Sequence, residues 1–115
     1  MMPDNDYMRQ MLLSFAASPK DRLCYQNYVT TSPKHQKEHF HALLLEDAGV
    51  FQRTSRNCFR ITANGYKFIE AIQNDSVWDK VKRKAADIGN STVPALISIS
   101  LEMAKESLER ILKGE

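Results

Sequence analysis

Three arginines lie close together in a short stretch of alternating apolar and polar residues, between two patterns that predict helices. They are Arg53, Arg56 and Arg60. A guanidinium group keeps its charge at neutral pH and matches phosphate oxygens with two parallel N–H donors. The alternation that begins at Val50 predicts a β-hairpin, which would carry the arginines away from the helices. We therefore expect this hairpin to bind an anionic partner, most simply the phosphate backbone of nucleic acid.

Two further groups of basic residues could contribute to such an interface. The exposed start of a recognition helix contacts base edges in the major groove. The start of the helix predicted after Ser32 offers Lys34, His35, Gln36 and Lys37. The stretch "KVKRK" would add phosphate contacts if it lay on the same side, through Lys80, Lys82, Arg83 and Lys84. A solvated lysine face on a helix explains that stretch equally well.

The charge is unevenly distributed along the chain. The net charge of +2 is too small to indicate nucleic-acid binding by itself. Residues 53–84, however, hold eight Lys/Arg against three Asp/Glu, whereas residues 1–52 and 85–115 are slightly acidic. The excess of positive charge therefore falls on the hairpin and the segment after it, as expected if they face a polyanion.

Histidine and cysteine residues were considered as metal ligands. His35 and His39 are four residues apart, a spacing that can hold zinc on one helical face. Nevertheless, there is no H-E-x-x-H motif, no cysteine near them and no obvious third ligand, so we expect no bound metal. Cys24 and Cys58 have no C-x-x-C partner. They fit two free, half-buried thiols best, with a disulfide or a metal pair as the alternatives.

Motifs for catalysis are absent from the sequence. It has no glycine-rich phosphate loop, no paired carboxylates in a plausible cleft and no nucleophile motif, so we expect neither an enzyme nor a cofactor. Trp78 shares an apolar stripe with Val77 and Val81. This pattern favours packing in the core or against the last helix over stacking on a ligand.

Length and hydropathy restrict the class of protein. At 115 residues the chain can build one modest core. No segment approaches the ~20 apolar residues that span a bilayer. The N-terminus carries acids early and lacks the basic-then-apolar pattern of a secretion signal, which predicts a cytoplasmic protein with no membrane partner.

Helix and strand signals alternate along the first half of the chain. A helix is expected from about residue 4 to residue 17, followed by a short strand in "RLCYQNYV". The next helix begins with Ser32 as its cap and ends at Gly49. Its expected buried stripe consists of Phe40, Leu43, Leu44 and Ala48. On the return strand of the hairpin, Phe59 and Ile61 would face the core, and Cys58 and Arg60 would face outward.

Three more helices are predicted after the hairpin. Thr62 caps the first, which would turn Tyr66, Ile69 and Ile72 inward, and Asp75 or Ser76 caps the second. The last, about residues 93–112, has apolar residues at alternating spacings of four and three, the pattern of two packed helices. These positions are Ile97, Leu101, Ala104, Leu108 and Ile111. This helix would either fold back over its own core or pair with a second copy, and we favour a homodimer.

Two sequence motifs resemble known families. "HALLLEDAGV" resembles the end of the recognition helix in the ArsR and MarR regulators, and "FRITANGYKFI" is similar to their passage from wing to next helix. "FHALLLEDAGVF", "ITANGYKFIEAIQNDSVWDKVK" and the apolar last helix more closely resemble a family of small bacterial and phage-borne proteins of unknown function. That resemblance covers nearly all of residues 7–112, with Ile61 in place of Leu, Asn64 in place of a larger residue and Tyr66 in place of His. It implies a winged-helix fold and a phage or mobile-element setting.

The order of elements predicts a mainly α protein with a small β-hairpin (α+β). We expect a winged helix-turn-helix domain over residues 1–90 and an apolar C-terminal helix over residues 91–115. The first functional hypothesis is a phage or prophage regulator that binds double-stranded DNA as a homodimer. Against it, the segment before Ser32 has scarcely any room for the additional helix of a complete helix-turn-helix. The second hypothesis is therefore a protein-interaction module on the same scaffold, either an adaptor or a phage inhibitor of a host factor.

Overall fold

The computed structural model describes residues 1–25 and 32–114, and it divides into two compact units, residues 1–66 and 67–115. Helices make up most of the described chain and one small antiparallel sheet completes it, so the fold is α+β, as predicted. The division into domains at residue 90 stays a prediction, because compactness alone does not show which segments fold independently.

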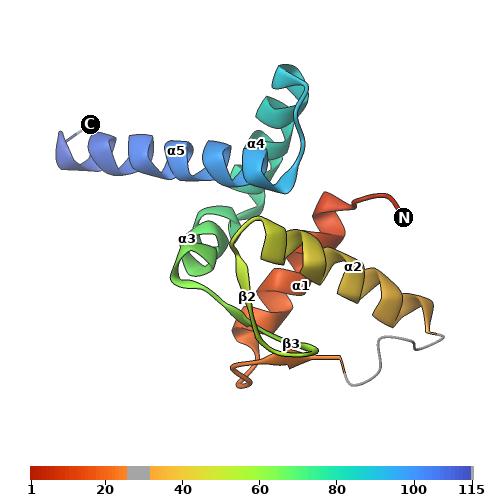
Figure 1. The fold of residues 1–115 in the computed structure, drawn as a ribbon. Helices are drawn as coiled ribbons and strands as arrows, with labels where there is room; N and C mark the ends of the chain where they lie inside the picture. Colours follow the sequence, from red (N-terminus) through yellow and green to blue (C-terminus); the bar gives the residue numbers. More distant parts are fainter. Residues whose placement is uncertain (26–31, 115) are drawn as a thin grey trace. The chain divides into compact units, whose positions relative to one another are not determined.

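The first unit combines helices with the sheet. Its elements are α1 (Asn5–Ala17), β1 (Leu23–Cys24), α2 (Pro33–Asp47), β2 (Phe51–Ser55), β3 (Cys58–Ile61) and the start of α3 (Ala63–Ile72). The strands pair antiparallel in the order β1-β3-β2, with β1 at one edge. Both α1 and the β2–β3 hairpin pack against α2 (Figure 1).

The predicted bounds of the first helix are confirmed. An Asp4 carboxylate oxygen accepts a hydrogen bond from the Tyr7 backbone N–H at 3.0 Å, which satisfies one of the free donors at the start of α1. The helix ends before Ser18, whose extended backbone conformation suits the residue before a proline. One face of the helix is buried through Met8, Leu12 and Phe15.

The end of α2 at Gly49 is also confirmed. Gly49 adopts a positive φ of 80°, a conformation that glycine takes without a steric penalty. Its N–H donates to Glu46 O at 3.1 Å, and the Val50 N–H donates to Leu45 O at 2.9 Å. These two hydrogen bonds form a Schellman motif, which reverses the chain toward β2.

The predicted buried stripe of α2 is wrong. The buried positions are His41, Ala42 and Leu45, and the four expected residues are only partly covered. His41 tolerates burial because both ring nitrogens are satisfied: Nε2 accepts from the Asp4 N–H at 3.0 Å and Nδ1 donates to Lys37 O at 2.8 Å. Ser32 occupies the N-cap position but makes no capping hydrogen bond through its side chain.

The hairpin follows the expected pattern except at its cysteine. Phe59 and Ile61 are buried, as predicted. Cys58 lies directly opposite Cys24 across the β1–β3 pair, and the two form a disulfide. The expectation of two free thiols is therefore wrong: antiparallel pairing places side by side two residues that lie 34 positions apart in sequence.

The second unit is helical. After α3 it contains α4 (Asp75–Ile88) and α5 (Val93–Leu112), the latter with the predicted bounds. Trp78, Val81 and Ala85 are buried on α4, so Trp78 packs in the core, as predicted. The expected cap at Asp75 or Ser76 is wrong, since Asn74 accepts the hydrogen bond from the Val77 N–H.

The inward face of α3 was predicted only in part. Ile69 and Ile72 are buried, as expected, but the Tyr66 side chain is 52% exposed. The Thr62 hydroxyl accepts from the Gly65 N–H at 2.9 Å, which confirms Thr62 as the cap of this helix.

Candidate nucleic-acid interface

The three hairpin arginines do not project together. Arg53 lies opposite the buried Phe59, whereas Arg60 lies opposite Gln52. Directly paired residues share a face of the sheet, and neighbours along a strand alternate between faces. Because Phe59 and Gln52 belong to opposite faces, Arg53 and Arg60 do as well. The expectation of one joint arginine cluster is therefore wrong.

Arg53 connects the hairpin to α2. Its Nε and Nη2 donate to the two Glu46 carboxylate oxygens at 3.0 and 2.9 Å, and its Nη1 donates to Arg56 O at 2.7 Å. The guanidinium carbon also lies 4.8 Å from the centre of the Phe59 ring. The hydrogen bond to Glu46 raises the pKa of Arg53 further above its usual value. A phosphate would have to displace a bidentate carboxylate, so this geometry suits a structural role for Arg53.

The other two hairpin arginines remain on the surface. Arg60 donates from Nε to Gln52 Oε1 at 2.7 Å and from Nη1 to Ile61 O at 3.3 Å. Arg56 is exposed at the turn between β2 and β3. Both positions are accessible to a large partner, although they do not form a single cluster with Arg53.

The predicted basic residues of α2 fall into two environments. Lys34 and His35 are exposed in the first turn. Lys37 instead faces α1: its Nζ lies 3.2 Å from an Asp4 carboxylate oxygen and 4.3 Å from the centre of the Tyr7 ring. The start of α2 therefore presents Lys34 and His35 to solvent, while Lys37 helps to join the two helices.

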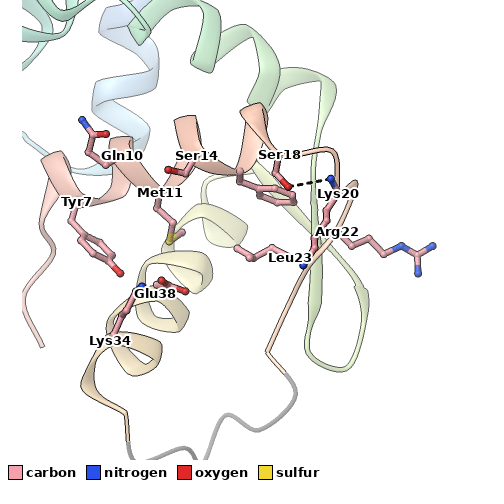
Figure 2. A pocket seen from close by; sticks show the side chains of 11 residues that line it. Tyr7, Gln10, Met11, Ser14, Ser18, Lys20, Arg22, Leu23, Lys34 and Glu38 are labelled. Atoms are coloured by element: carbon pink, nitrogen blue, oxygen red, sulfur yellow. Dashed lines mark hydrogen bonds between the residues drawn. The ribbon is translucent and has the colours of Figure 1, made fainter.

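The structure adds two basic residues that the sequence analysis missed. Lys20 and Arg22, between α1 and β1, line a hollow of about 470 Å³ together with Lys34 and Glu38. Figure 2 shows Lys34 on α2 at one side of the hollow and Lys20 and Arg22 at the opposite side, where the Arg22 side chain extends away from the hollow, with Met11 between the helices. No side-chain ion pair holds Lys20, Arg22 or Lys34 within the part of the chain that the structure describes. Lys20 and Arg22 lie within residues 1–52, whose slight net negative charge gave no indication of a basic surface.

The basic residues of α4 belong to the second unit. Lys80, Arg83 and Lys84 are exposed, at spacings that place them on one side of the helix. Lys82 lies 3.8 Å from an Asp79 carboxylate oxygen and 5.7 Å from the centre of the Trp78 ring. This arrangement suits a solvated helix face as well as a phosphate-binding one.

The histidine pair considered for zinc binding is split between environments. His35 is exposed, whereas the His39 ring lies 5.4 Å from the Tyr25 ring and 6.5 Å from the Phe59 ring, centre to centre. Burial lowers the pKa of His39. Among residues 1–25 and 32–114, no three His, Cys, Asp or Glu side chains are grouped closely enough to hold a metal ion.

Within the described residues, no helix is both long enough and apolar enough to cross a membrane.

Comparison with known proteins gives one family. No curated protein and no solved structure matches the chain. Residues 3–91 match the family described as "Hypothetical protein (DUF2513)". This match spans well over half of the 115 residues, and the chain belongs to the DUF2513 family.

Proposed function

We propose that this protein binds double-stranded DNA through the surface formed by Lys20, Arg22, Lys34 and His35. The observation that carries the proposal is the hollow lined by Lys20, Arg22 and Lys34, on whose opposite sides two separate chain segments place exposed cations. A phosphate backbone that followed the hollow would meet a cation at each end. The adjoining first turn of α2 would then face the groove.

The surface differs from the one expected from the sequence. Arg53 is left out because Glu46 already holds it, and Lys37 because Asp4 does. Arg56 and Arg60 would add peripheral phosphate contacts from the hairpin. Lys80, Lys82, Arg83 and Lys84 would join only if α4 faced the same duplex.

The proposed fold, location and regulatory role rest on the resemblance to phage-borne proteins and to winged-helix regulators. On that basis the proposal includes a winged-helix fold, a cytoplasmic location and a phage or prophage regulatory role. Such regulators bind DNA as dimers, since paired half-sites match a two-fold protein axis.

The C-terminal helix supplies a surface for the proposed dimer. The C-terminal end of α5 extends past α4 (Figure 1), and Leu108, Ile111 and Leu112 are 56%, 70% and 77% exposed. With Ile97, Leu101 and Ala104, which are partly or fully exposed, Leu108 and Ile111 form the predicted heptad stripe. Replacing both Leu108 and Ile111 with Glu should turn the dimer into a monomer in sedimentation velocity. Replacing the outward-facing Glu106 with Gln should leave it dimeric, and a monomeric wild type would contradict the pairing.

The DNA proposal is tested by the salt dependence of affinity for a labelled duplex. Each phosphate contact contributes about 0.9 to the slope of log affinity against log salt. The double variant Arg22→Ala/Lys34→Ala should therefore lower the slope by about 1.8. The charge-matched control is Lys67→Ala/Lys105→Ala, at two exposed positions outside the proposed surface, and it should leave the slope unchanged. An equal loss in both variants would refute the assigned surface, and no binding by wild type at low salt would refute DNA binding.

A second candidate is a protein-interaction module without DNA binding. The Arg53–Glu46 pair favours it, because this pair removes one of the three arginines of the expected wing from contact with phosphate. The apolar end of α5 would then meet a different protein rather than a second copy. This alternative predicts no duplex binding at any salt concentration and capture of a host protein that survives nuclease treatment.

A further inference from the structure

We propose that the Cys24–Cys58 disulfide is a redox-reversible latch that holds β1, and with it Lys20 and Arg22, against the sheet. The inference concerns the regulation of the surface in the proposed function and rests on that function for its effect on DNA. The latch itself is a property of the fold and can be measured without DNA.

The strand β1 is held only weakly by its backbone hydrogen bonds. It contains two residues, Leu23 and Cys24, and occupies an edge of the sheet. Beyond its two paired positions, the adjoining Tyr25 N–H donates to Asn57 O at 2.8 Å. A strand this short gains little from its ladder, because few hydrogen bonds offset the lost backbone entropy.

The side chain of Tyr25 anchors the end of β1. The Tyr25 ring is buried, with its centre 6.4 Å from that of the Phe59 ring. Its hydroxyl oxygen is also buried but has no hydrogen-bond partner in the part of the chain that the structure describes. Desolvation of an unpartnered hydroxyl offsets part of the gain from burying the ring. The disulfide is therefore the strongest link between β1 and β3.

The Cys24–Cys58 disulfide is accessible from solvent. Cys24 is exposed and Cys58 is partly exposed, so a solvent thiolate can reach the bond. Disulfides that reductants can reach are the labile and regulatory ones, and a disulfide in a cytosolic protein is usually redox-sensing or catalytic. An accessible disulfide in a chain with a proposed cytoplasmic location is thus suited to reversible reduction.

The reaction is thiol–disulfide exchange with a small dithiol. One thiolate of the dithiol attacks the Cys24 sulfur, the bond to Cys58 breaks, and the Cys58 sulfur leaves as a thiolate that takes up a proton. The second thiolate of the dithiol then attacks the mixed disulfide and releases the Cys24 sulfur, which is protonated in turn. Two electrons pass to the protein, and the dithiol becomes a cyclic disulfide.

The consequence for the basic surface follows from chain connectivity. Arg22 directly precedes β1 and Lys20 lies two residues earlier, with its N–H also donating to Ser18 Oγ at 3.1 Å, so the attachment of β1 positions Arg22 and contributes to the position of Lys20. Lys34 belongs to α2 and is held independently. Reduction would free the first two cations from their places around the hollow while α2 stays folded.

The test is hydrogen–deuterium exchange of the full chain, oxidised and reduced with dithiothreitol. Reduction should speed exchange in the segment 19–25 at least tenfold and leave α1 and α2 protected. The variant Cys24→Ser/Cys58→Ser should show the fast exchange in both conditions. If that variant fails to fold, wild type reduced and then alkylated replaces it. Unchanged exchange in segment 19–25 after reduction would overturn the latch.

Duplex affinity separates the latch from the proposed function. If the oxidised chain binds duplex DNA, reduction should weaken that binding at least tenfold at low salt. Binding that is equally tight after reduction would overturn regulation by the latch. If the oxidised chain binds no duplex, the proposed function fails, and exchange in segment 19–25 still decides whether the latch exists.

Discussion

Gly65 is the position where a single added methyl group should damage the first unit most. A Cβ at this residue would lie 2.5 Å from the Val50 carbonyl oxygen and 2.9 Å from Ile61 Cγ2. The carbonyl cannot easily move, because it accepts a hydrogen bond from the Thr62 N–H at 2.9 Å. The close approach of helix α3 to β2 and β3 therefore requires glycine here.

The size of the effect follows from opposing contributions. Gly→Ala within a helix gains about 1 kcal/mol from backbone propensity. Relief of the clash would strain or break this hydrogen bond, which is worth about 1 kcal/mol. It would also disturb the packing of Val50 and Ile61, and overpacking of this kind costs about 1–3 kcal/mol. The net expectation for Gly65→Ala is a loss of about 2 kcal/mol in the free energy of unfolding, despite the better helix former.

Urea unfolding followed by circular dichroism tests this expectation, with the disulfide kept oxidised. The matched control is Asn64→Ala, one residue earlier in the same helical turn, where the side chain is exposed. It should be neutral or should raise stability by a few tenths of a kcal/mol. If Gly65→Ala proves as stable as wild type, the reasoning from the Val50 carbonyl is refuted.

Two further predictions concern stability. Cys24 and Cys58 close a loop across 34 positions, and the chain-entropy treatment assigns such a cross-link about 4 kcal/mol. Reduction should therefore lower the urea midpoint clearly, and a midpoint that stays constant would contradict a formed disulfide. The pKa of Asp4 is lowered, first by the Tyr7 backbone N–H and then by Lys37, so ionised Asp4 stabilises the fold. That stability is present above the ordinary value of 3.8 and is lost as pH falls through the lowered pKa. Asp4→Asn should thus be less stable than wild type near neutral pH, and the difference should shrink in acid. A gap that does not change with pH would count against the ion pair.

Sequence patterns were most informative where one local signal fixes one local structure. The end of α2 is an example, because Gly49 is the residue that a left-handed backbone conformation favours. The buried face of α2 escaped the same reasoning. A count of large apolar residues leaves out His41, whose Nε2 accepts a hydrogen bond from the backbone N–H of Asp4, the N-cap residue of α1.

The errors at the candidate site have a different cause, which is strand register. Whether Arg53 and Arg60 share a face depends on which residues pair across the hairpin, and the structure shows an irregularity between Arg53 and Ser55. The disulfide similarly depends on the pairing of β1 with β3. Neither pairing can be read from residue spacing, because long-range contacts set it.

The number of cations around the hollow links the DNA proposal to the dimer proposal. Without the peripheral contacts of Arg56 and Arg60, the hollow supplies three contacts per chain, from Lys20, Arg22 and Lys34. These correspond to a salt slope of about 2.7 for a monomer and about 5.4 for a dimer that uses both surfaces. Raising salt from 50 to 200 mM would then weaken a monomer about 40-fold and a dimer about 2,000-fold. Replacing Leu108 and Ile111 with Glu should move wild type from the steep dependence to the shallow one without touching a basic residue. If wild type has a slope near 2.7 and the double variant does not alter it, each chain binds DNA alone. The exposed leucine and isoleucine of α5 would then need another explanation.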